Sequence, residues 1–138
     1  AQRKRQEHAV RKAIFTGSAP APVGPYSQAI AVDGWLFVSG QIAIDPASGR
    51  MVQPEIAAQT RQALQNLREV LKAAGADIDD VVKTTVYLTD LGQFPEMNTV
   101  YAEFFGRSAP ARSTVEVAAL PKDSLVEIEC IARLPAQS

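Results

Sequence analysis

Three charged residues stand in two stretches of sequence that otherwise have the pattern of β-strands. Apolar residues recur at every second position in 111–117 and again from 125, which predicts two paired strands joined by a proline-containing turn. Arg112 lies in the first strand, and Glu127 and Glu129 lie in the second. Because an unpaired buried charge is costly, these side chains are expected to have partners. A fixed guanidinium beside a fixed carboxylate could hold and act on a small carboxylate substrate, or the two groups could pair for structural reasons.

Four further polar positions could contribute to a site, and each has a plainer structural interpretation. Tyr26 follows a rigid Gly-Pro turn, so its hydroxyl could point into a cleft or its ring could cap the core. Ser39 and Gly40 end an apolar strand, where glycine permits either a β-bulge or a close approach of the backbone to a ligand. Asn98 falls in a predicted helix, where the pattern indicates a solvated or capping side chain. The residue pattern alone leaves the alternatives for Tyr26, Ser39 and Gly40 open.

The types of residue that are scarce in this chain restrict its chemistry. The one histidine, His8, lies in a basic N-terminal stretch, and the one cysteine, Cys130, is predicted to be a small buried residue of a strand. We therefore expect no Ser-His-Asp or Cys-His device and no metal site. The sequence contains no glycine-rich phosphate-binding motif, so no cofactor is expected either. A reaction would use arginine, glutamate, tyrosine, hydroxyls, backbone amides and water.

Size and charge predict one domain after a basic tail. The chain has 138 residues, of which 46% are hydrophobic, and its formal net charge is −1. This length supports one core, and the near-neutral charge argues against a dedicated nucleic-acid-binding surface. Residues 1–11 are expected to form a flexible basic tail and 12–138 the domain. No segment has the pattern of a membrane span or a secretory signal. We expect a cytoplasmic protein, or one of an organellar matrix if the tail is a transit remnant.

The domain is predicted to be α+β, with the element order β-β-β-α-β-α-β-β. The Asp33-Gly34 pair predicts a hairpin, and Gly75 is the expected stop of the first helix. The two helices most simply cover one face of a sheet. Strict alternation would put Val82 on one side of its strand and Val81 on the other, so the second face also needs a cover, which predicts a closed homo-oligomer with its helices outside. The expected strands are 12–16, 27–32, 35–39, 81–89, 111–117 and a last one from 125, and the expected helices are 54–74 and 94–105.

Several motifs together resemble the RidA/YjgF family, the reactive-intermediate deaminases of enamines and imines. The similarity covers about Lys12 to Arg133, and its motifs agree in order and spacing. It implies a chorismate-mutase-like fold, a homotrimer and active sites in clefts between subunits. The motifs are Gly24-Pro25-Tyr26-Ser27-Gln28-Ala29, Val38-Ser39-Gly40-Gln41-Ile42, Val82-Lys83-Thr84-Thr85-Val86-Tyr87-Leu88, Pro110-Ala111-Arg112-Ser113-Thr114-Val115-Glu116-Val117 and Ile128-Glu129-Cys130-Ile131-Ala132.

The resemblance also implies roles for individual residues. Arg112, Glu127 and Tyr26 would be catalytic, and Ser39, Gly40, Asn98 and Thr114 would bind the substrate. Thr114 stands where some members have cysteine, so a thiol is dispensable. The implied reaction is hydrolysis of 2-imino acids, such as 2-iminobutanoate and 2-iminopropanoate, to 2-keto acids and ammonia, without a cofactor. The alternatives are a non-enzymatic trimer that binds 2-keto acids and an RNA-directed translation inhibitor or endoribonuclease.

Overall fold

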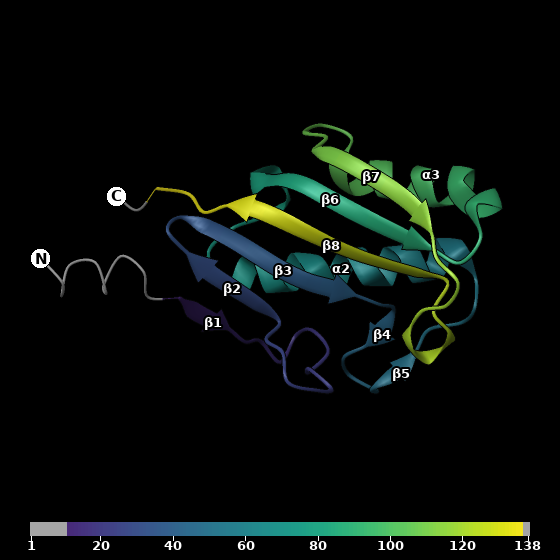
Figure 1. The fold of residues 1–138 in the computed structure, drawn as a ribbon, viewed down its shortest axis with the longest axis horizontal. Coiled ribbons are helices and arrows are strands. Elements are labelled where there is room, and N and C mark those ends of the chain that lie inside the picture. Colours follow the sequence, from purple (N-terminus) through teal and green to yellow (C-terminus); the bar gives the residue numbers. More distant parts are fainter. Residues whose placement is uncertain (1–10, 137–138) are drawn as a thin grey trace, which may run out of the picture.

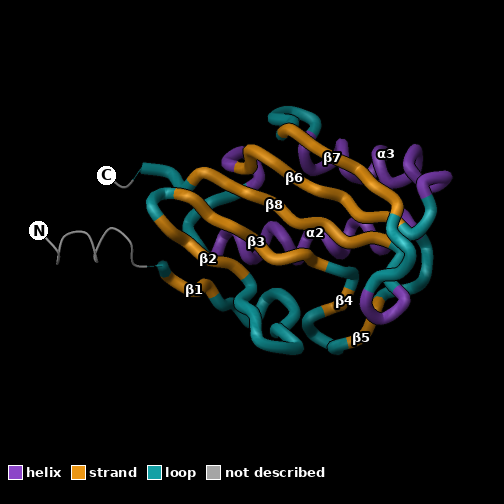
Figure 2. Tube along the Cα trace, viewed as in Figure 1, coloured by secondary structure: helices purple, strands orange, loops and turns teal. Residues whose placement is uncertain are grey.

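A six-stranded mixed sheet forms the centre of the computed structural model, which describes residues 11–136 (Figures 1 and 2). Most of the predicted basic tail, residues 1–10, lies outside the described residues. Strand β7 runs parallel to β6, and all other neighbouring strands of this sheet are antiparallel. From one edge to the other the strands are β1 (Lys12–Ile14), β2 (Ala29–Val32), β3 (Trp35–Gln41), β8 (Val126–Arg133), β6 (Val81–Leu88) and β7 (Ala111–Glu116).

The two strands with the charged residues, β7 and β8, are not neighbours, so the prediction that they pair is wrong. Helix α3 (Phe94–Phe105) connects β6 to β7, and two parallel strands need such a crossover because both run in the same direction. Strand β8 pairs instead with the other edge of β6 and with β3. The sequence pattern could show that both strands exist, but not that a third strand separates them.

Both helices cover one face of the sheet, as predicted (Figure 1). Helix α2 (Ile56–Ala73) begins two residues later than expected, because Glu55 has an extended backbone and forms the N-cap. The helix ends before Gly75, whose φ of +86° is easily adopted by glycine. Its buried stripe packs under the central strands and forms the core with the inward residues of β3, β6 and β8. The buried residues of this stripe are Ile56, Gln59, Thr60, Ala63, Leu64, Asn66, Leu67, Val70 and Leu71.

Three local differences from the sequence prediction have identifiable causes. Strand β1 ends early because the Thr16 amide donates to the side chain of Gln28 instead of continuing the ladder. A register shift in β6 buries Val81 and exposes Val82, where strict alternation had put Val82 with the buried residues. A small additional hairpin, formed by β4 (Ile44–Asp45) and β5 (Arg50–Met51), is absent from the predicted element order because two-residue strands are too short to show an alternating pattern.

The sheet face away from the helices is partly apolar and carries charged residues. Phe37 and Val115 are exposed on this face, and Glu127 and Glu129 alternate along β8 with residues that are buried against α2. Such a mixture is unusual for a surface that meets only water. In the described part of the chain, neither helix is long and apolar enough to cross a membrane.

Candidate functional site

A cavity of about 550 Å³ opens where β3 and β8 meet three irregular segments. These segments are the loop 16–28, the segment 42–44 after β3, and the short 3-10 helix Pro121–Asp123. The cavity brings together five of the residues singled out from the sequence. They are Tyr26, Ser39, Gly40, Glu127 and Glu129.

Gly40 allows the carboxylate of Glu127 to lie directly against the backbone of β3. A Cβ atom built at Gly40 would overlap Glu127 Oε2, so no larger residue fits without moving that carboxylate. The register between β3 and β8 shifts between Val38 and Gln41, so Ser39 and Gly40 form a bulge. Of the two alternatives at this position, the structure shows the bulge, and the group that approaches the backbone is the protein's own carboxylate.

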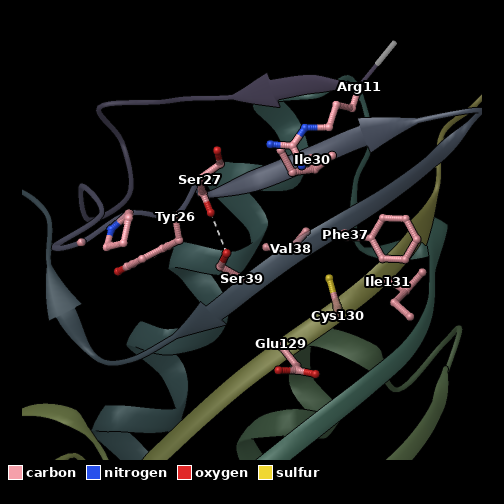
Figure 3. Close-up of a pocket in the computed structure, with 12 residues that line it drawn as sticks. Arg11, Tyr26, Ser27, Ile30, Phe37, Val38, Ser39, Glu129, Cys130 and Ile131 are labelled. Atoms are coloured by element: carbon pink, nitrogen blue, oxygen red, sulfur yellow. Dashed lines mark hydrogen bonds between the residues drawn. The ribbon is translucent and has the colours of Figure 1, made fainter. Parts of the chain in front are cut away.

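A second cavity, of about 690 Å³, adjoins the first and shares Tyr26, Ser39 and Glu129 with it (Figure 3). The Ser39 hydroxyl donates to the Ser27 carbonyl at 2.6 Å, so its proton is already used within the protein. The ring of Tyr26 is 51% exposed and does not cap the core. Its hydroxyl accepts a bond of 3.3 Å from the Val23 amide, which leaves the phenolic proton available to a ligand.

The half-buried carboxyl of Glu127 is electrostatically distinct from a surface glutamate. Burial, and then the negative charge of Glu129, raise its pKa. Tyr87, which lies opposite Glu127 on β6, has its own pKa raised by burial and by Glu129. A carboxyl group with a raised pKa forms a carboxylate that is a stronger base than usual. Such groups suit proton transfer near neutral pH.

Arg112 lies on the other face of the sheet, under α3. Its Nη1 donates to Asn98 Oδ1 at 2.8 Å. Its guanidinium carbon lies 4.6 Å from the ring centroid of Tyr101 and 5.3 Å from that of Phe94. Within residues 11–136 it forms no ion pair with Glu127 or Glu129, so the structural pairing considered from the sequence does not occur there. The bond to Asn98 uses one of the five guanidinium N–H groups, so others remain that can bind a carboxylate.

Sequence reasoning missed the aromatic residues that hold Arg112. Phe94 and Tyr101 are seven residues apart with Asn98 between them, so all three lie on one face of α3. The Tyr101 hydroxyl is bonded to Thr84 Oγ1 at 2.7 Å in the core, which fixes the ring. The helical spacing of these residues was the available signal, but a stripe of this kind is equally typical of ordinary core packing.

Thr114 follows Arg112 on the same face of β7. Its Oγ1 is buried and has no hydrogen-bond partner among the described residues. Arg112, Asn98 and Thr114 thus form one group, and the cavity residues around Glu127 form another. No hydrogen bond in the described chain links the two groups.

Comparison with known proteins identifies the family. The family model described as endoribonuclease L-PSP matches residues 16–134. The chain belongs to the RidA/YjgF family. Relatives include a RutC family protein of Pyrococcus horikoshii, 55% identical over 89% of this chain and 98% of its own length. The mouse protein named 2-iminobutanoate/2-iminopropanoate deaminase is 51% identical over 89% of this chain and 91% of its own. A Rid family structure from Yersinia pestis superposes with a TM-score of 0.89, at 48% identity over 91% of this chain and all of the other.

The thiol of this RidA/YjgF protein belongs to a residue that lines the second cavity but not the one that holds Glu127 (Figure 3). Cys130 is buried, and burial, followed by the charge of Glu129, raises its pKa to about 12. The thiolate is therefore negligible at neutral pH, and the interpretation of Cys130 as a small buried residue is confirmed. Across residues 11–136, no three His, Cys, Asp or Glu side chains gather closely enough to hold a metal ion.

Proposed function

We propose that this protein hydrolyses 2-imino acids to 2-keto acids and ammonia, at sites formed between the subunits of a homotrimer. The observation that carries the proposal is the division of the polar residues into two half-sites on opposite faces of the sheet. The first half-site holds Arg112, and the second holds Glu127 in the cavity. The name of the mouse relative, a 2-iminobutanoate/2-iminopropanoate deaminase, supports the reaction.

The first half-site suits a carboxylate. The guanidinium of Arg112 is held by two aromatic rings and by Asn98, so its orientation is set before a ligand arrives. Two N–H groups of an arginine that lie in one plane can bind a carboxylate through two parallel hydrogen bonds. The backbone of Thr114, two residues further along the same strand, would add a contact to the same ligand. These contacts would fix the imine carbon relative to the partner half-site.

The second half-site suits a nucleophilic water. Glu127, with its raised pKa, would remove a proton from water as the oxygen attacks the imine carbon. The C=N π electrons pass to nitrogen, which takes up the proton that Glu127 removed, so the carbon becomes tetrahedral and bears OH and NH₂. Transfer of the hydroxyl proton to that nitrogen, again through Glu127, then lets ammonia leave as the C=O bond forms and leaves Glu127 ionised. Tyr26, which lines the cavity, would donate its phenolic proton to the reacting groups.

The exposed sheet face supports the proposed assembly. Phe37 and Val115 lie on the face that the helices do not cover, together with the charged residues of β8. Packing this face against copies of the chain would remove apolar surface from water, at about 25 cal/mol for each Å² buried. A closed arrangement would also bring the Arg112 group of one subunit to the cavity of another.

Wild-type protein is expected to be a trimer by light scattering at micromolar concentration and to release ammonia from enzymatically generated 2-aminoacrylate. Arg112→Ala and Glu127→Gln homotrimers should each be inactive. Mixed trimers made by refolding the two together should recover part of the activity, because some interfaces then combine two intact half-sites. A stable monomer would contradict sites shared between subunits. So would mixed trimers whose activity never exceeds that of the two mutant homotrimers. Keto-acid binding without ammonia release would favour the non-enzymatic alternative.

The dependence of activity on pH is expected to follow the charge of Glu129. Glu127 works as a base only when ionised, so kcat/KM should fall as the pH drops through its raised pKa. Glu129→Gln removes one cause of that rise, so the acid limb of the kcat/KM profile should move to lower pH. Glu55→Gln, at an exposed residue outside the cavity, is the control and should leave the limb in place. An unchanged limb in Glu129→Gln would show that another group controls it.

A further inference from the structure

Three buried side-chain amides each bond to the backbone of a different wall of the 550 Å³ cavity. We propose that Gln28, Gln59 and Asn66 are positioning residues that together hold the cavity in the shape its ligand needs. The three are only 1–2% exposed, although glutamine and asparagine are mostly surface residues. The proposal deepens the proposed function, because the walls carry the groups that would face the substrate, but wall position can be measured without any reaction.

Gln28 holds the first wall, the loop 16–28. Its Nε2 lies 3.1, 3.4 and 2.9 Å from the carbonyl oxygens of Thr16, Ala19 and Pro20, and its Oε1 accepts from the Thr16 amide at 2.7 Å. The loop contains no strand or helix between 16 and 28, so these bonds replace a regular ladder. The same loop carries Tyr26 into the cavity.

Asn66 holds the second wall, the segment 42–44. Its Nδ2 donates to the carbonyls of Ile42 at 3.1 Å and Ile44 at 2.9 Å. Gln62, one turn earlier on α2, donates to Asn66 Oδ1 at 2.9 Å. This bond fixes the amide with its oxygen toward Gln62 and both N–H groups toward the wall.

Gln59 holds the third wall, which contains the 3-10 helix Pro121–Asp123. Its Oε1 accepts from the Leu125 amide at 2.9 Å, two residues after that short helix ends and two residues before Glu127 in the cavity. Lys122 and Asp123 have φ values of +54° and +56°, a region that side-chain-bearing residues rarely adopt. A strained turn keeps such a conformation only when its surroundings fix it, and the Gln59 bond is one of these fixed points.

The placement of the three amides explains why polar groups were kept in the core. Gln59 and Asn66 are seven residues apart, so they lie on one face of α2, two turns from each other. From there they reach two walls that belong to different parts of the chain, while Gln28, the last residue of the loop before β2, ties the remaining wall together. Irregular segments leave backbone groups without ladder partners, and buried amides can both accept and donate to satisfy them. Three walls are thereby tied to the rigid part of the fold.

The test compares Gln28→Leu, Gln59→Leu and Asn66→Leu with Val70→Ala. Val70 is buried on α2 and forms no side-chain hydrogen bond to a wall. Its truncation therefore lowers stability without removing a hydrogen bond that holds a wall. Hydrogen exchange is followed at amides bonded within one wall: Tyr26 for the first, Ile44 for the second and Ser124 for the third. Steady-state kcat and KM for imine hydrolysis are measured well below each Tm.

Each leucine variant is expected to speed exchange mainly in its own wall and to lower kcat/KM about tenfold or more, chiefly through KM. Val70→Ala should have a lower Tm, with neither faster exchange in one wall nor a lower kcat/KM. If the leucine variants change only Tm, as Val70→Ala does, or if exchange rises evenly over all three walls, the positioning role is wrong. If each leucine variant speeds exchange only in its own wall but wild-type protein shows no deamination, the positioning role stands and the proposed reaction fails.

Discussion

Replacing Arg112 with lysine is expected to lower kcat/KM for 2-imino acids by roughly 30-fold to several-thousand-fold. A charge-assisted contact of this kind typically contributes about 2–5 kcal/mol, and an ammonium cannot reproduce the planar pair of N–H groups. Lysine would also lose the guanidinium's contacts with the rings of Tyr101 and Phe94. The measurement is steady-state ammonia release over a range of substrate concentrations.

Arg61→Lys is the matched control for this substitution. Arg61 forms an exposed ion pair with Glu103 at 3.2 Å, and exposed pairs contribute little to stability. This control should therefore keep near-full activity and an unchanged Tm. Arg112→Lys with near-full turnover would remove the carboxylate-binding role, and a keto-acid sensor would then be the leading interpretation. A loss of trimer in Arg112→Lys, with normal activity in the trimers that remain, would indicate a structural role instead.

Replacing Glu127 with glutamine is expected to lower kcat by about 10²- to 10⁴-fold, while KM changes much less. Glutamine keeps the shape that fits against Gly40 but cannot take a proton from water. Single-turnover measurements of ammonia release, together with binding of 2-oxobutanoate, separate the two effects. Binding should persist in the variant, since the carboxylate contact is made by Arg112 on the partner half-site.

Stability provides an independent check on Glu127. Burial raises its folded-state pKa above the unfolded value, so the ionised carboxylate disfavours folding at pH values above that folded pKa. Glu127→Gln should therefore have an equal or higher Tm than wild type at neutral pH, and this advantage should vanish in acid, where both forms are neutral. Glu103→Gln, at an exposed carboxylate, should change neither activity nor the pH dependence of Tm. A lower Tm in Glu127→Gln at neutral pH would point to a structural carboxylate.

Local patterns in the sequence were sufficient to predict most of the elements. The Asp33-Gly34 turn, the stop of α2 before Gly75 and the two helices depend on interactions between residues a few positions apart. The order of strands and helices and the face that the helices cover followed from these elements. The chemistry-bearing residue types, above all Arg112 and Glu127, also stood out because charges interrupt apolar strands.

The tertiary structure decided which of those residues meet. Arg112 and Glu127 lie on strands that alternation identified correctly, yet β6 lies between them and their side chains leave the sheet on opposite faces. A strand's pattern shows which residues share its own face, but not which strand lies beside it. The bulge at Gly40 that admits the carboxylate of Glu127 and the rings that hold Arg112 depend likewise on contacts between distant segments. Local residue spacing does not encode such contacts, because they form only when the whole core has packed.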